Sequence, residues 1–172
     1  MKTPIKIFSE NLPKPRRKTI QYILGTLCKQ KKLTLATVES CTGGLISKMI
    51  TEIPGSSAYF KGGLTAYSTE IKLNVLGVTK KTVSSFGAIS RECAFEMAVR
   101  AKKIFKTDFA VSTTGIAGPS GATPENPIGL VYFGLAAPKK TKTYKRMFKG
   151  ERKHIQRQAA TFALNLILKN IE

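Results

Sequence analysis

The stretch LTLATVESCTGGLISKMITEI, residues Leu33–Ile53, decides the fold because it contains a strand, a turn and a helix in succession. Leu33–Val38 is apolar and rich in β-branched residues, which predicts a buried strand, and Leu45–Ile53 has the apolar spacing of a helix. The turn between them, Glu39–Gly44, exposes backbone N–H groups at the positive end of a helix. Such an end suits a phosphate or a developing oxyanion. The plainer interpretation is that Ser40 or Thr42 simply caps the helix.

Outward from this stretch, predicted helices and strands alternate along the chain. We predict helices over Arg17–Lys31, Thr69–Leu76, Lys80–Phe86, Ser90–Phe105 and Glu151–Ile171, and strands over Gly63–Tyr67, Asp108–Thr113, Ile128–Ala137 and Lys142–Phe148. The last strand is more polar than the others, which is typical of a sheet edge. The alternation predicts a three-layer α/β/α domain with a mostly parallel or mixed central sheet, and ligand sites at the carboxyl ends of its strands.

Length and composition predict one globular domain. The chain has 172 residues, of which 42% are hydrophobic, and this length can bury a substantial core. Residues 1–16, with Pro13 and Pro15, are expected to form an irregular basic arm, and residues 17–172 the domain. No apolar run reaches the roughly 18 residues needed to span a bilayer, so we expect a cytoplasmic protein with no membrane contact.

The formal net charge is +19, with basic residues gathered near Lys14–Lys18 and Lys139–Lys153. Such a field attracts anions, from nucleotides to nucleic acid. No zinc finger, RNP-type aromatic motif or clear helix-turn-helix pattern accompanies it. Nucleic-acid binding is therefore an expectation that charge allows but does not favour.

Nucleophile and base candidates are few. The cysteines, Cys28, Cys41 and Cys93, form no Cys-x-x-Cys pair, and the chain has a single histidine, His154, so neither a zinc site nor a Ser-His-Asp triad is expected. Cys41 lies at a helix start, where a thiol pKa can be lowered, but it lacks a histidine partner in the sequence.

A desolvated lysine can deprotonate a serine in place of histidine. Lys48, Lys61 and Lys72 lie near the hydroxyl-rich segments. Lys72 follows Tyr67 by five residues across a strand-to-helix junction, so both could reach one pocket. An ordinary surface role is the alternative for each lysine.

Several separate segments, in order, resemble the CinA C-terminal domain family, the nicotinamide-nucleotide amidases. The resemblance is carried by Glu39–Gly44, Gly55–Phe60, Ala66–Ser68, Gly87–Ser90 and Thr114–Pro119, with Pro127–Val131 and Gly150–Arg152 fitting as well. It covers the chain from about Thr19 to the C-terminus. The molybdopterin-binding-like domain that precedes this unit in longer family members is absent here, so a stand-alone amidase is expected.

This resemblance implies hydrolysis of nicotinamide mononucleotide to nicotinate mononucleotide and ammonia, a step of pyridine-nucleotide salvage. It implies a Ser/Lys dyad that needs neither metal nor cofactor. Carried over to this chain, Ser57 is the preferred nucleophile, Lys72 its base and Tyr67 the residue that orients the pair. Ser40 is the competing nucleophile, and otherwise a substrate-binding or oxyanion residue.

The resemblance also implies a substrate pocket and a partner. The pocket walls are expected from Glu39, Thr42, Gly43, Gly44, Thr114 and Gly115, with Arg152 or Arg157 binding the phosphate. A homo-oligomer is expected. The alternative is a catalytically inactive module that binds a nucleotide or nucleic acid, which the family's competence label and the +19 charge motivate.

Overall fold

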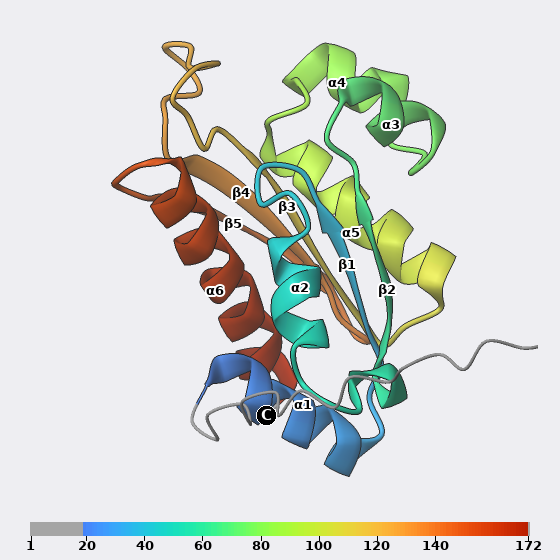
Figure 1. Ribbon diagram of the computed structural model, residues 1–172. Coiled ribbons are helices and arrows are strands. Elements are labelled where there is room, and N and C mark those ends of the chain that lie inside the picture. Colours follow the sequence, from blue (N-terminus) through green and yellow to red (C-terminus); the bar gives the residue numbers. More distant parts are fainter. Residues whose placement is uncertain (1–18, 172) are drawn as a thin grey trace, which may run out of the picture.

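The computed structural model describes residues 19–171 (Figure 1). The expected arm, residues 1–16, lies outside them. The elements in chain order are α1 (Ile20–Lys31), β1 (Leu35–Glu39), α2 (Leu45–Thr51), the short 3₁₀ helix η1 (Ser56–Ala58), β2 (Phe60–Thr65), α3 (Thr69–Asn74), α4 (Lys80–Phe86), α5 (Arg91–Phe105), β3 (Phe109–Gly115), β4 (Leu130–Ala136), β5 (Thr141–Met147) and α6 (Arg152–Ile171).

The five strands form one mixed sheet in the order β2-β1-β3-β4-β5. β2, β1 and β3 run parallel, and β4 and β5 continue the sheet antiparallel. Glu39, the last residue of β1, lies opposite Thr65 and Thr113. The carboxyl ends of the three parallel strands therefore meet at one edge of the sheet.

Helices cover both faces of the sheet, as the alternating pattern predicts. Figure 1 shows α1, α2 and α6 on one face and α5 on the other, with α3 and α4 beyond the carboxyl ends of the parallel strands. β1 is buried along its whole length. Its Leu35 belongs to the core on the α6 side, whereas Ala36 and Val38 belong to the core on the α5 side. The three-layer α/β/α prediction is confirmed.

The predicted start of β2 was wrong. Gly62 and Gly63 lie inside the strand, which begins at Phe60 opposite Leu35. Gly63 leaves room for a neighbouring strand and helix, because a Cβ there would collide with the hydroxyls of Thr37 and Ser47. The glycine pair therefore serves packing and does not mark the end of a loop.

β5 is an edge strand, as its polar sequence predicts. Within residues 19–171 it pairs with β4 alone. None of the helices in this part of the chain combines the length and the hydropathy that crossing a bilayer requires.

Candidate active site

A pocket of about 270 Å³ opens at the carboxyl edge of the parallel strands. Its walls come from the turn after β1, the β2–α3 connection, the loop before α5, the loop after β3 and the start of α6. The volume lies near the lower bound of the roughly 300–1,000 Å³ that is typical of small-molecule sites. The position is the one expected for a ligand site in an α/β sheet.

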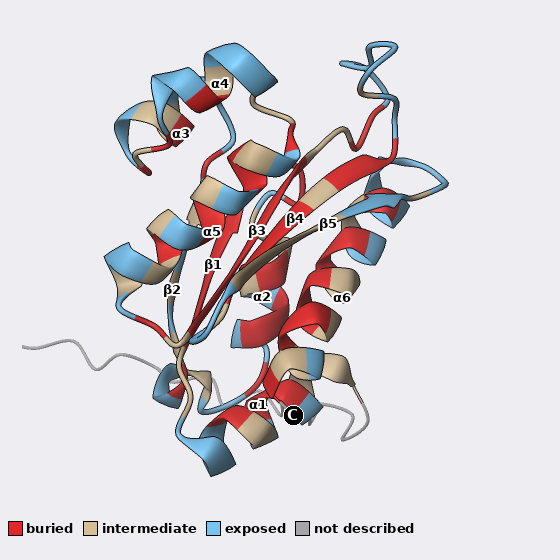
Figure 2. Ribbon diagram, turned by 180° about the vertical axis from the view of Figure 1, so that it is seen from behind, coloured by how far each residue is buried: buried red, intermediate tan, exposed pale blue. Residues whose placement is uncertain are grey.

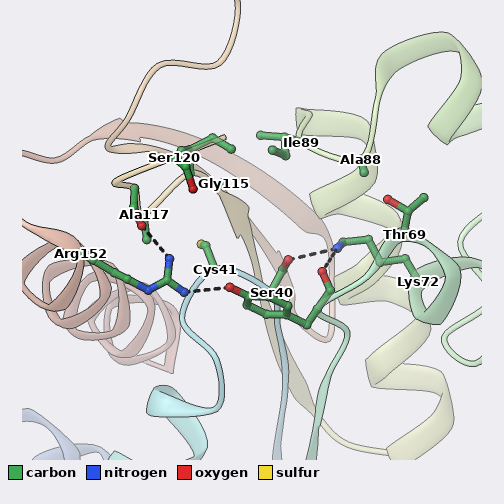
Figure 3. Close-up of a pocket in the computed structure, with 13 residues that line it drawn as sticks. Ser40, Cys41, Thr69, Lys72, Ala88, Ile89, Gly115, Ala117, Ser120 and Arg152 are labelled. Carbon is green, nitrogen blue, oxygen red and sulfur yellow. Dashed lines mark hydrogen bonds between the residues drawn. The ribbon is translucent and has the colours of Figure 1, made fainter. Parts of the chain in front are cut away.

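Ser40 and Lys72 meet at the floor of this pocket. Lys72 Nζ lies 3.0 Å from Ser40 Oγ (Figure 3). It donates to the carbonyl oxygens of Ala66, at 2.9 Å, and Tyr67, at 3.5 Å. Only 3% of Lys72 and 8% of Ser40 is exposed. A neutral amine has two N–H groups and one lone pair. The two carbonyls can take the N–H groups, which leaves the lone pair facing the serine hydroxyl.

The surroundings favour this neutral amine. Burial lowers the pKa of Lys72 below its usual value because desolvation penalises the ammonium. Thiolates at Cys41 and Cys93 would oppose this shift, but burial raises their own pKa values to about 12 and about 11. Both thiols are therefore uncharged near neutral pH, and they do not raise the pKa of Lys72 back toward its usual value.

Glu39 fixes the turn that presents Ser40. Its fully buried carboxylate accepts hydrogen bonds from the backbone N–H groups of Gly44, Ile46 and Ser47 and from the Ser47 hydroxyl, at 2.8–3.0 Å. Glu39 therefore occupies the start of α2 itself. The expectation that this helix end binds a substrate phosphate, and that Glu39 touches the substrate, is corrected: the carboxylate is the anion bound there.

Cys41 follows Ser40 and lines the pocket. The expectation of a lowered thiol pKa at a helix start is wrong: burial raises the pKa of Cys41 to about 12, and α2 begins only at Leu45, with the Glu39 carboxylate at its end. The backbone N–H of Cys41 donates no hydrogen bond to another residue of the described chain. This N–H belongs to the residue that directly follows Ser40.

Ser57 lies far from this pocket. It is exposed in η1, immediately before β2, whereas Lys72 lies beyond the carboxyl end of the same strand. The six residues of β2 span about 20 Å at the usual rise per strand residue. The expected pairing of Ser57 with Lys72 is therefore corrected, and Ser40 takes the place beside the amine. Lys48 pairs with Glu52 at 3.1 Å on an exposed surface, and Lys61 is exposed.

Tyr67 and Arg152 lie at the mouth of the pocket. Arg152 donates from Nη2 to the Tyr67 hydroxyl at 2.8 Å and from Nη1 to the Gly118 carbonyl at 2.7 Å (Figure 3). Gly115 lines the pocket, as expected. Arg157 lines a separate recess beside Phe148.

The remaining residues predicted to form the wall, Thr42, Gly43, Gly44 and Thr114, do not line this pocket. The hydroxyls of Thr42 and Thr113 bond to each other at 2.8 Å, and Thr114 donates to the Ala88 carbonyl at 2.8 Å. All three threonines are buried. Gly43 and Gly44 adopt positive φ angles of 63° and 95°, which the sharp turn into α2 requires.

Sequence reasoning missed two contributors. Gln156 donates to the Cys41 carbonyl at 2.9 Å and holds the turn from α6. Its spacing of four residues from Arg152 places both on one side of a helix, and this was the available signal. Ser120, from the loop after β3, also lines the pocket.

Comparison with known proteins identifies relatives of this chain. The model of the CinA C-terminal domain family matches residues 17–171. A protein of Halothermothrix orenii, provisionally named competence-damage inducible, is 51% identical over 150 residues, which cover 85% of this chain and 36% of that protein. A CinA-like protein of Endomicrobium trichonymphae is 45% identical over 153 residues, covering 89% of this chain and 36% of the relative. The chain thus spans about a third of the length of these curated relatives.

Solved structures agree with the fold. The crystal structure of the competence/damage inducible protein CihA from Agrobacterium tumefaciens has 35% identity and a TM-score of 0.86, and the match covers 89% of this chain and 94% of that one. A CinA superfamily protein from Klebsiella pneumoniae 700603 has 27% identity and a TM-score of 0.85, covering 88% of this chain and 95% of that one.

Proposed function

The chain belongs to the CinA C-terminal domain family, and we propose that it is an amidohydrolase in which Ser40 is the nucleophile and Lys72 its base. One observation carries the proposal: a buried lysine, its pKa lowered by desolvation, lies 3.0 Å from a serine hydroxyl at the floor of a pocket. This arrangement supplies the activated nucleophile that amide hydrolysis needs without histidine.

The proposed reaction proceeds through an acyl-enzyme. The neutral amine of Lys72 takes the proton of Ser40 as Oγ attacks the carboxamide carbon. The developing oxyanion accepts a hydrogen bond from the backbone N–H of Cys41. The Lys72 ammonium then gives its proton to the leaving nitrogen as the C–N bond breaks, which releases ammonia. Lys72, neutral again, takes a proton from the water that attacks the ester and gives it to Ser40 Oγ as the C–O bond breaks, which releases the acid.

We propose nicotinamide mononucleotide as the substrate and nicotinate mononucleotide as the product. The family resemblance supports this choice, and so does the cationic mouth. Arg152 uses one N–H of each terminal nitrogen on Gly118 and Tyr67. Its remaining N–H groups can bind a phosphate. Arg152 is therefore the better phosphate candidate than Arg157, which lines another recess.

The test is ammonia release from nicotinamide mononucleotide by the purified protein and three variants. Ser40→Ala and Lys72→Ala should each lower kcat/KM by about 10³-fold or more, since each removes half of the nucleophile–base pair. Ser57→Ala is the matched control, because it removes an exposed serine hydroxyl of the other candidate segment, and it should retain wild-type activity. Retained activity in Ser40→Ala would exclude the proposed nucleophile.

A further inference from the structure

A furrow runs between the free edge of the sheet and the last helix, away from the pocket. It consists of two recesses of about 560 Å³ and about 480 Å³, which share Phe162 and Asn165 of α6. We call it the β5–α6 furrow. Along α6 it extends from Arg157 to Lys169, about 18 Å at the helical rise per residue. Figure 2 shows β5, mostly half-buried or exposed, at the sheet edge with α6 beside it.

The furrow is cationic. Lys142 and Arg146 of β5 line it from one side, and Arg157 and Lys169 of α6 from the other. Among the residues that the structure describes, no carboxylate lines either recess. The four cations therefore face open space without a neutralising partner in the walls. An extended anion laid along the furrow would pass all of them.

Planar side-chain groups (a guanidinium and aromatic rings) and asparagine amides lie among these charged residues. The Arg146 guanidinium stands 4.9 Å from the centre of the Phe162 ring, and the half-buried ring of Tyr144 lines the same recess. Asn165 and Asn170 each use their side-chain nitrogen on a carbonyl of α6. Their amide oxygens remain available as acceptors in the described chain. Guanidinium planes, aromatic rings and amides are the groups that contact unstacked bases.

We propose that the β5–α6 furrow is a second binding site, whose ligand is single-stranded nucleic acid. Cations spaced along a narrow furrow fit a chain of phosphates, and the flat and amide groups fit its bases. A second copy of this chain would bring the same positive edge and be repelled, because lysine on an edge strand blocks strand-to-strand pairing. A planar lipid surface does not match a concave site.

This binding is separate from the amidase chemistry. The furrow shares no lining residue with the pocket that holds Ser40 and Lys72. Its charge can therefore be altered without touching the proposed catalytic groups. Arg157 is kept in all variants because the sequence also makes it a candidate for binding the substrate phosphate.

The test measures binding of a fluorescent 20-nucleotide oligo-dT to the full chain by anisotropy across a salt series. The furrow variant is Lys142→Ala/Arg146→Ala/Lys169→Ala. The matched control, Lys80→Ala/Lys81→Ala/Lys103→Ala, removes three exposed lysines from α4 and α5. Each phosphate contact contributes about 0.7 to the log–log salt slope on a single strand, so the furrow variant should lose about 2 from the slope. If the two proteins bind equally at 1 M salt, this difference makes the furrow variant bind roughly 100-fold more weakly than wild type at 0.1 M salt.

The expected result also includes unchanged ammonia release in both triple variants and less than about threefold weaker binding in the control. Three outcomes would overturn the proposal. The wild-type chain could fail to bind at 50 mM salt. The control could lose as much affinity as the furrow variant, which would indicate diffuse attraction. Polyphosphate of equal charge, or duplex DNA, could bind as tightly as oligo-dT, which would exclude a role for unstacked bases.

Discussion

The side chains of Tyr67 and Arg152 meet across the mouth of the pocket, with 2.8 Å between the tyrosine oxygen and Nη2 of the arginine. Arg152 is also held by the carbonyl of Gly118 at 2.7 Å. These two bonds join the β2–α3 connection, the loop after β3 and the start of α6. They hold the guanidinium at the mouth of the pocket, where we propose that it binds the substrate phosphate.

Removing the tyrosine hydroxyl should therefore weaken substrate binding more than chemistry. In Tyr67→Phe, Arg152 keeps its bond to Gly118 but loses its second anchor. We expect KM for nicotinamide mononucleotide to rise about 3–10-fold, the loss of roughly one hydrogen bond, with kcat changing less than twofold. Tyr22→Phe, which removes a hydroxyl from α1, is the control. A large fall in kcat with unchanged KM would place the Tyr67 hydroxyl in the chemical step instead.

A second prediction concerns Glu39, whose carboxylate accepts four hydrogen bonds at the start of α2. Glu39→Gln replaces one acceptor oxygen with a donor that faces backbone N–H groups. Buried donors left without a partner cost about 1–3 kcal/mol each, so the free energy of unfolding in urea should fall by about 2–3 kcal/mol. Glu52→Gln, on an exposed helix end, should change it by less than about 0.5 kcal/mol. Equal effects of the two substitutions would contradict the structural role of Glu39.

The layered fold could be predicted from the sequence because the spacing of apolar residues indicates which faces of each strand and helix are buried. Leu33–Val38 lacks alternation since both faces of β1 are covered, and such a run indicates a central strand. The position of β2 was harder to predict from the sequence. Gly62 and Gly63 look like a loop, and only the packing of Thr37 and Ser47 against Gly63 explains why glycines lie within a strand.

The candidate site, too, could be predicted from the sequence only in part. Glu39–Gly44 follows a strand and Gly55–Phe60 precedes one, so a parallel sheet places the two hydroxyl-rich segments at opposite edges. That order argues against a pairing of Ser57 with Lys72, which only the family resemblance favours. The contact of Gln156 with Cys41 joins residues 115 positions apart, and that of Glu96 with Thr79 joins two consecutive helices. No local pattern specifies such contacts.

Glu96 leads to a prediction about stability at acid pH. Its carboxylate on α5 accepts hydrogen bonds from Thr82 and from the hydroxyl and N–H of Thr79, and so ties α4 to α5. Partial burial opposes ionisation, but these bonds outweigh it and hold the pKa of Glu96 below its usual value. A carboxyl whose pKa is lower in the folded state stabilises the fold above its unfolded pKa of about 4.3. That contribution is lost as pH falls through the folded value.

The difference in unfolding free energy between wild type and Glu96→Gln should therefore be about 1–2 kcal/mol at pH 6–7. It should shrink steadily as the pH falls from about 5 toward 3. Glu70→Gln, which changes an exposed carboxylate at the start of α3, is the control and should give a small difference at pH 6–7. A Glu96→Gln difference that stayed constant with pH would show that ionisation of Glu96 contributes nothing.

The last prediction concerns the pH dependence of the proposed amidase. Lys72 acts as a base only when neutral, so kcat/KM should rise with pH and level off above the pKa of Lys72 in the free enzyme. Because burial lowers that pKa, the midpoint should lie below the value of about 10.4 for an exposed lysine. Lys72→Arg preserves a cation but cannot lose its proton, so it should be inactive at every pH. Lys48→Arg, on the exposed face of α2, should keep the wild-type profile. A flat profile from pH 6 to 10, or activity in Lys72→Arg, would mean that Lys72 stabilises charge as an ammonium and that another group takes the serine proton.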